Sequence, residues 1–146
     1  MILFCDTSAL VKLYVEEVGS AEMLAAVARA RMVAVVRIAW AEIMAALARR
    51  VRERPIDAAA IDIVRARLRD DWTNYAIVEV TQALVELAGT FADAFALRGY
   101  DSVQLASART VQQATRDELR FACFDARLTQ AAMLLGIAPL RMRSSQ

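Results

Sequence analysis

The chain contains no histidine, and this absence restricts its chemistry more than any other feature of its composition. Catalytic triads and dyads with an imidazole base are excluded, and so are zinc sites that use imidazole ligands. Only two cysteines are present, Cys5 and Cys123, each beside an apolar run. We expect both to be buried free thiols in a reducing cytosol. Acid–base or metal chemistry must therefore depend on carboxylates.

Glycine and proline are also scarce, with four and two residues respectively in a chain of 146. This leaves little room for a disordered linker, so we expect one domain over residues 1–142 and a frayed tail over 143–146. The apolar stretch 25–48 is interrupted by three arginines and one glutamate, so no membrane span is expected. The opening residues lack a basic region before their apolar run. We therefore expect no signal peptide and a cytoplasmic location.

Lysine occurs once, at Lys12, and the net charge is +1. A nearly neutral chain does not have the composition of a general nucleic-acid binder. In contrast, hydrophobic residues make up 58% of the chain, which is high for a soluble domain. We therefore expect part of the apolar surface to be covered by a partner or a second copy, as in a homodimer.

Short apolar runs alternate with amphipathic segments along the chain. We predict strands at 2–5, 32–36, 75–80 and 121–124, with a short edge strand at 139–142. We predict helices at 6–15, 21–29, 38–52, 55–71, 81–97, 101–114 and 125–136. Continuous apolar strands separated by helices are typical of a parallel sheet covered on both faces. The expected fold is α/β, with a central parallel sheet of four to five strands and ligand sites outside their carboxyl ends.

Three aspartates lie where ligand sites of a parallel sheet are expected, at strand ends or at the start of a following helix. Asp6 directly follows the first predicted strand, Asp125 directly follows the fourth, and Asp101 begins a helix after Gly99. Each one alone is better explained as a helix N-cap than as a catalytic acid, and such a cap typically contributes about 1 kcal/mol. Gln104 would complete a capping box with Asp101. Capping does not explain why an aspartate twice follows a buried strand, and neighbouring first and fourth strands would place Asp6 beside Asp125.

Glu42 is a weaker candidate by spacing, because it lies opposite the helical stripe of Trp40, Met44 and Leu47 and is expected to be solvated. If the four acids converge, two charges about 4 Å apart repel by roughly 4 kcal/mol at an effective dielectric of 20. Such a cluster must take up protons or bind a cation, and oxygen ligands suit Mg²⁺ or Mn²⁺. A metal-bound water can then attack a phosphodiester.

Four segments resemble the acidic blocks of PIN-domain ribonucleases, and within that family the VapC toxins of VapBC toxin–antitoxin pairs. The segments are Cys5–Tyr14, Ala41–Leu47, Leu97–Ala106 and Phe124–Leu128, in the order and at the spacing of the family. The third block departs at one place. It reads Ser-Val-Gln104 after its aspartate, where the family often has Ala, a hydrophobic residue and His.

The resemblance implies a single PIN-like domain and endonucleolytic cleavage of RNA with Mg²⁺ or Mn²⁺. It makes Asp6, Glu42, Asp101 and Asp125 the metal-binding acids. Glu42, which spacing alone favoured least, thereby becomes a member of the expected site. A hydroxyl of Thr7 or Ser8 would orient a water or phosphate, although helix capping explains these residues equally well. The resemblance further implies a homodimer, a VapB-type antitoxin and contact with DNA only through that antitoxin.

The remaining acids and several other function classes fit the sequence less well. Asp93 is expected at the surface, and Arg49, Arg50, Arg52 and Arg54 are expected to be a solvated helix end rather than an RNA contact. A haloacid-dehalogenase-type phosphatase needs a second aspartate where this chain has Ser8, and a receiver domain needs a late lysine. A catalytically silent protein-binding module, whose acids only cap helices, stays open as the alternative.

Overall fold

A single parallel sheet organises the chain in the computed structural model, which describes residues 1–142. Its strands follow the order β3-β2-β1-β4-β5 and all neighbouring pairs are parallel. They are β1 (Ile2–Cys5), β2 (Met32–Val36), β3 (Ala76–Val78), β4 (Leu119–Ala122) and β5 (Ala138–Pro139). The predicted α/β class and the sheet of four to five strands are confirmed. The tail predicted over 143–146 lies outside the described residues.

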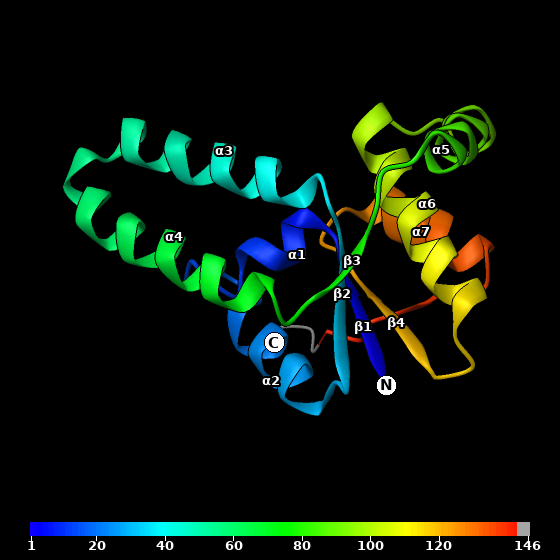
Figure 1. The fold of residues 1–146 in the computed structure, drawn as a ribbon, viewed down its shortest axis with the longest axis horizontal. Coiled ribbons are helices and arrows are strands. Elements are labelled where there is room, and N and C mark those ends of the chain that lie inside the picture. Colours follow the sequence, from blue (N-terminus) through cyan, green and yellow to red (C-terminus); the bar gives the residue numbers. More distant parts are fainter. Residues whose placement is uncertain (143–146) are drawn as a thin grey trace.

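Helices cover the sheet on both faces, as predicted. They are α1 (Thr7–Val11), α2 (Ser20–Arg29), α3 (Ala39–Glu53), a 3₁₀ turn (Pro55–Asp57), α4 (Ala58–Trp72), α5 (Gln82–Phe95), α6 (Gly99–Ala114) and α7 (Ala126–Leu134). Figure 1 shows α1 to α4 on one side of the sheet and α5 to α7 on the other. The antiparallel pair α3 and α4 projects away from the sheet (Figure 1). Between residues 1 and 142, no helix has the length and apolarity needed to cross a membrane.

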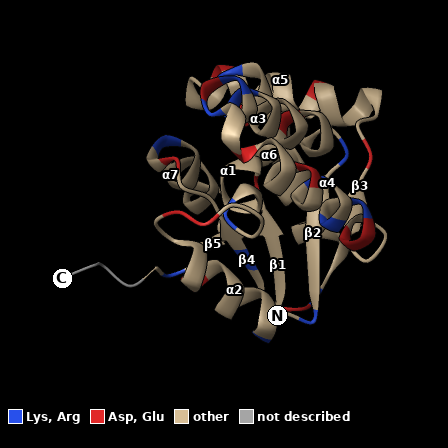
Figure 2. Cartoon of the chain, turned by 90° about the vertical axis from the view of Figure 1, so that its left-hand side faces the viewer, with Lys and Arg blue, Asp and Glu red and all other residues tan. Residues whose placement is uncertain are grey.

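The central strand β1 explains why the apolar runs are unbroken. All four of its residues are buried. Successive side chains of a strand point to opposite faces, and here both faces are covered by helices. On one face Phe4 stacks on Phe121 of β4, with ring centroids 5.8 Å apart. Figure 2 shows β1 and β2 without charged residues, whereas β4 contains Arg120 and other charged positions lie on the helices and connecting segments.

The strand order reverses direction at β1. After β1 the chain forms β2 and β3 on one side of it. The connection through α5 and α6 then returns the chain to the other side of β1, where it forms β4 and β5. Open parallel sheets bind ligands in the crevice at such a switch point, at the carboxyl ends of the two strands concerned. The backbone N–H of Asp6 donates to the carbonyl of Ala122 at 3.1 Å. The first candidate acid therefore lies at the switch point.

Two predicted boundaries near the candidate acids are wrong. The fourth strand was predicted over 121–124, but it ends at Ala122, because Phe124 leaves the ladder and donates its N–H to the Ser8 hydroxyl at 3.0 Å. Asp125 therefore does not directly follow a strand. The first helix ends at Val11 rather than near residue 15, because turns replace the regular helix from Lys12 onward.

The boundary at Asp101 is also different from the prediction. Helix α6 begins at Gly99, with Arg98 as its N-cap and no side-chain cap bond. Asp101 lies inside the first turn, so the capping box predicted for Asp101 and Gln104 is wrong. Neither side chain is needed to cap this helix, and both are available for contacts with other parts of the fold.

Candidate active site

Asp6 is the most buried of the four candidate acids, with 5% of its surface exposed. It is the N-cap of α1, and its Oδ1 accepts hydrogen bonds from the N–H of Ala9 at 2.9 Å and from the hydroxyl of Ser8 at 2.7 Å. Burial raises the pKa of Asp6 well above its usual range, and the charge of Asp101 raises it further. A helix cap is usually solvated, so capping alone does not account for this burial.

Glu42 lies in the first turn of α3 and is half-buried, so the predicted solvated position is wrong. Its Oε1 accepts hydrogen bonds from the Thr7 hydroxyl at 2.9 Å and from the Gln104 side-chain amide at 3.1 Å. Burial raises the pKa of Glu42, and the charges of Asp6 and Asp101 add to this effect. Helices α1 and α6 therefore cover a face of α3 that periodicity alone assigns to solvent.

Asp101 and Asp125 extend the group of acids toward the surface. Burial raises the pKa of Asp101, and the nearby charge of Asp125 raises it further. Asp125 is exposed and caps α7, accepting the N–H of Leu128 at 2.9 Å. Each of the four acids thus has at least one other as an electrostatic neighbour. Asp125 is the outermost, and its neighbour in the group is Asp101.

Cys123 occupies the position beside Asp6 that Asp125 was predicted to hold. Cys5 pairs with Ala122 in the sheet, so the next positions, Asp6 and Cys123, face each other. The Cys123 thiol donates to the backbone carbonyl of Asp125 at 3.5 Å and accepts the Asp125 N–H at 3.3 Å. Burial raises the pKa of this thiol far above its usual range, and the charge of Asp6 raises it further. Both cysteines are free, but only Cys5 is fully buried, so the prediction of two buried thiols is only half right.

The hydroxyls of Thr7 and Ser8 both hold carboxylates. Thr7 donates to Glu42, while Ser8 donates to Asp6 and accepts the N–H of Phe124 at 3.0 Å. The helix cap in this segment is Asp6 itself. Capping therefore does not explain these two hydroxyls, whereas orientation of the acids does. A direct role of either hydroxyl toward water or phosphate stays a prediction.

The donor set fits a hard divalent cation in its chemistry. Carboxylate oxygens are the ligands that Mg²⁺ and Mn²⁺ prefer. A cation would offset both the burial of charge, which is the main cause of the raised pKa of Asp6, Glu42 and Asp101, and their mutual repulsion, which adds to it. Within residues 1–142, however, no three acidic or cysteine side chains are close enough together to form a complete metal-binding group. An ion shared by three of these acids would thus require side-chain rotation.

The raised pKa of Asp6 leads to a prediction about pH. Below the ordinary value of 3.8 the carboxyl is protonated in both the folded and the unfolded chain. As the pH rises above that value, the unfolded chain releases its proton while the folded chain retains it, so folding loses stability until the folded group also ionises. Without divalent metal, the stability of Asp6→Asn relative to the wild type should therefore increase as the pH is raised above 4, as measured by urea unfolding. A stability difference that does not change with pH would contradict this.

Other candidate features lie apart from the four acids. Asp93 is exposed on α5, as predicted. Among the predicted solvated arginines, Arg49 pairs with Glu53, and Arg50 and Arg54 both pair with Asp57. These pairs support the prediction of a solvated helix end.

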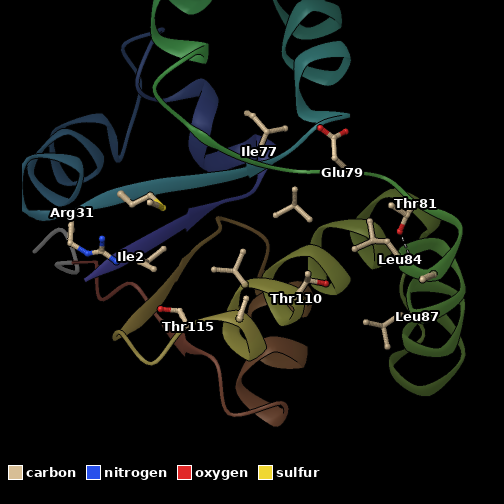
Figure 3. A pocket seen from close by; sticks show the side chains of 14 residues that line it. Ile2, Arg31, Ile77, Glu79, Thr81, Leu84, Leu87, Thr110 and Thr115 are labelled. Carbon is tan, nitrogen blue, oxygen red and sulfur yellow. Dashed lines mark hydrogen bonds between the residues drawn. The ribbon is translucent and has the colours of Figure 1, made fainter.

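A largely apolar cavity of about 710 Å³ opens between the β2–β3 side of the sheet and helices α5 and α6 (Figure 3). Its apolar lining includes Ile2, Met32, Ile77, Val78, Leu84 and Leu87. Hydroxyls from Thr81, Thr110 and Thr115 also line it. None of the four candidate acids contributes to its wall. This apolar cavity and the group of acids are thus separate features of the molecule.

The sequence of the chain matches a known family and two curated proteins. A model of the PIN domain family matches residues 3–132. Two curated relatives from Mycobacterium tuberculosis, named Ribonuclease VapC45 and Ribonuclease VapC49, are each 33% identical over 143 residues. In each case the match covers 97% of this chain and 97% of the relative.

Solved structures share the fold at low sequence identity. FitAcB from Neisseria gonorrhoeae has a TM-score of 0.64 and 16% identity, and the match covers 97% of both chains. A toxin–antitoxin complex from Klebsiella pneumoniae has a TM-score of 0.61 and 19% identity, covering 86% of this chain and 87% of that one. VapBC2 from Rickettsia felis, bound to a DNA fragment from its promoter, has a TM-score of 0.56 and 13% identity, covering 86% and 88%. With the fold, the acid blocks and the 33% identical relatives in agreement, the chain belongs to the PIN domain family, in the branch of the VapC proteins.

Proposed function

We propose that the chain is the toxin of a type II toxin–antitoxin pair and a Mg²⁺- or Mn²⁺-dependent endoribonuclease. The observation that carries this proposal is the electrostatic coupling among the acids next to the switch point of the sheet. Asp101 acts on Asp6, both act on Glu42, and Asp125 acts on Asp101. Burying acids next to one another is unfavourable unless a cation or protons offset the charge. The names of the two ribonuclease relatives support RNA as the substrate.

The four acids would hold the divalent ion, which supplies an activated water and neutralises charge on the phosphodiester. The chain's own residues set the positions of the acids. Thr7 and Gln104 fix Glu42, and Ser8 fixes Asp6. The one lysine of the chain, Lys12, bonds Glu17 at 3.0 Å and is not needed as a base. In a chain that has no histidine, the carboxylates would therefore be the groups that hold or accept protons.

Partners are proposed from the same comparisons. Two of the neighbouring structures are a toxin–antitoxin complex and a VapBC pair on promoter DNA. We therefore propose a VapB-type antitoxin as the protein partner, with DNA contacted only through it. The hydrophobic fraction of 58% and the open apolar cavity at α5 and α6 support association with a second copy as a homodimer.

An RNA cleavage assay with end mapping tests the function directly. Purified protein is incubated with structured and single-stranded RNA in Mg²⁺ or Mn²⁺, and the new ends are mapped by primer extension. We expect cuts at discrete internal positions, because an endonuclease with a shaped groove selects its sites. No cleavage of any RNA, combined with tight binding of an antitoxin-type protein, would instead support the alternative of a catalytically silent protein-binding module.

A further inference from the structure

We propose that Gln104 is a positioning residue of the candidate active site, holding Glu42 and Thr7 through its side-chain amide. This inference rests on the proposed metal-dependent ribonuclease function and adds a residue to its machinery. Gln104 lies on α6, one turn beyond Asp101, and only 2% of its surface is exposed. Few glutamines are buried to this degree, so its contacts require an explanation.

The contacts of Gln104 form a closed set of three hydrogen bonds. Its Nε2 donates to Thr7 Oγ1 at 3.0 Å and to Glu42 Oε1 at 3.1 Å. The Thr7 hydroxyl donates to the same Glu42 oxygen at 2.9 Å. One carboxylate oxygen thus receives two donors, one from α1 and one from α6, while Glu42 itself comes from α3. Two donors on one oxygen restrict the rotation of the Glu42 side chain.

The charge of Glu42 determines which side of the amide faces it. A rotated amide would bring the Gln104 oxygen against the Glu42 carboxylate oxygen, and two acceptors repel each other. The donor side must therefore face Glu42 whenever that acid is ionised. The contact is thus specific for a hydrogen-bond donor, and a side chain of similar size without an N–H does not replace it.

The other end of the amide has no such role. The Gln104 Oε1 is buried and has no hydrogen-bond partner among the residues that the structure describes. A buried, unpaired acceptor is unfavourable for folding, and an apolar side chain of similar length would fill the space without that penalty. Packing alone therefore does not account for glutamine here. The two donor contacts on Thr7 and Glu42 do.

The experiment compares Gln104→Met with the wild type in the full-length protein. Methionine has a similar length but lacks the amide donor. We expect the dissociation constant for Mn²⁺, measured by calorimetry, to rise or kcat for RNA cleavage to fall by about 10- to 100-fold, which is typical when the partner of a metal ligand is removed. KM should change little, and the thermal midpoint should equal or exceed that of the wild type. A purely structural role predicts a lower midpoint instead.

Two further variants complete the design. Ser107→Ala is the matched control, because Ser107 is also fully buried on α6 but bonds only the carbonyl of Val103 in its own helix. It should leave Mn²⁺ binding and kcat unchanged. Gln104→His retains an N–H donor and should be closer to the wild type than Gln104→Met. If the methionine variant does not fold, Gln104→Leu, which also lacks the amide donor, takes its place in this comparison.

The outcomes separate this inference from the proposed function. A wild type that binds Mn²⁺ and cleaves RNA, with a folded Gln104→Met variant that does both equally well, overturns the role of Gln104 and leaves the function intact. A methionine variant that loses activity only in proportion to a lower thermal midpoint also overturns it. A wild type that neither binds Mn²⁺ nor cleaves RNA overturns the proposed function and this inference together.

Discussion

Replacing Asp6 with asparagine should abolish RNA cleavage while the fold is retained. Asparagine keeps the size of the side chain and an oxygen that can cap α1 at the N–H of Ala9, so the local structure should survive. It removes one negative charge from the most buried acid of the site. A ligand of the divalent ion would thus be lost without a change in packing. We expect kcat to fall by about 10³-fold or more, equivalent to roughly 4 kcal/mol of transition-state stabilisation.

Initial rates on a mapped RNA substrate, with circular dichroism as the check of folding, measure this effect. Asp93→Asn is the matched control, because Asp93 is an exposed aspartate on α5. It should cleave at the wild-type rate. Cleavage by Asp6→Asn within about threefold of the wild type, a difference of less than 1 kcal/mol in activation free energy, would contradict the carboxylate mechanism.

Removal of divalent cations should have an effect of comparable size. The chain has no histidine and its single lysine is paired with Glu17, so we expect no other residue to replace the metal. Dialysis against EDTA should abolish cleavage, and Mg²⁺ or Mn²⁺ should restore it. Added metal should also stabilise the fold, by about 2.7 kcal/mol when its free concentration is 100 times the dissociation constant.

Thermal unfolding with increasing Mn²⁺ separates specific binding from a general salt effect. The midpoint should rise for the wild type and rise much less for Glu42→Gln, which removes a half-buried carboxylate of the proposed site. NaCl at matched ionic strength is the second control, because screening alone acts on all exposed charges. Full cleavage in EDTA, or the same Mn²⁺ shift in both proteins, would show that the acids do not hold the ion.

Local patterns predicted much of the fold and one part of the site well. The apolar runs indicated a parallel sheet, because a strand covered on both faces has no polar side, and β1 is buried at all four residues. Asp6 was identified because it directly follows that strand, which places it at the carboxyl edge of the sheet. The fourth strand was misplaced because Cys123 and Phe124 are as apolar as a strand requires, although Phe124 is 39% exposed.

Glu42 and Gln104 show where local patterns stop being informative. The periodicity of α3 distinguishes the apolar face that packs on the hydrophobic core from the opposite, polar face. It does not show which other helices cover that polar face. Thr7 and Gln104 reach Glu42 across 35 and 62 residues of sequence. Gln104 could be noticed in advance only as a departure from the family pattern, and its expected capping contact was wrong.

The amino-acid sequence by itself determined the α/β class, the exclusion of histidine chemistry and the position of Asp6, because these follow from residue types and from contacts between near neighbours in the chain. Only the tertiary structure decided that Glu42 is half-buried, that Cys123 rather than Asp125 faces Asp6, and that Gln104 joins α6 to α1 and α3. The physical reason is that a packed site is formed by side chains from distant segments. Their meeting depends on how whole helices pack against the sheet, which no short stretch of sequence encodes.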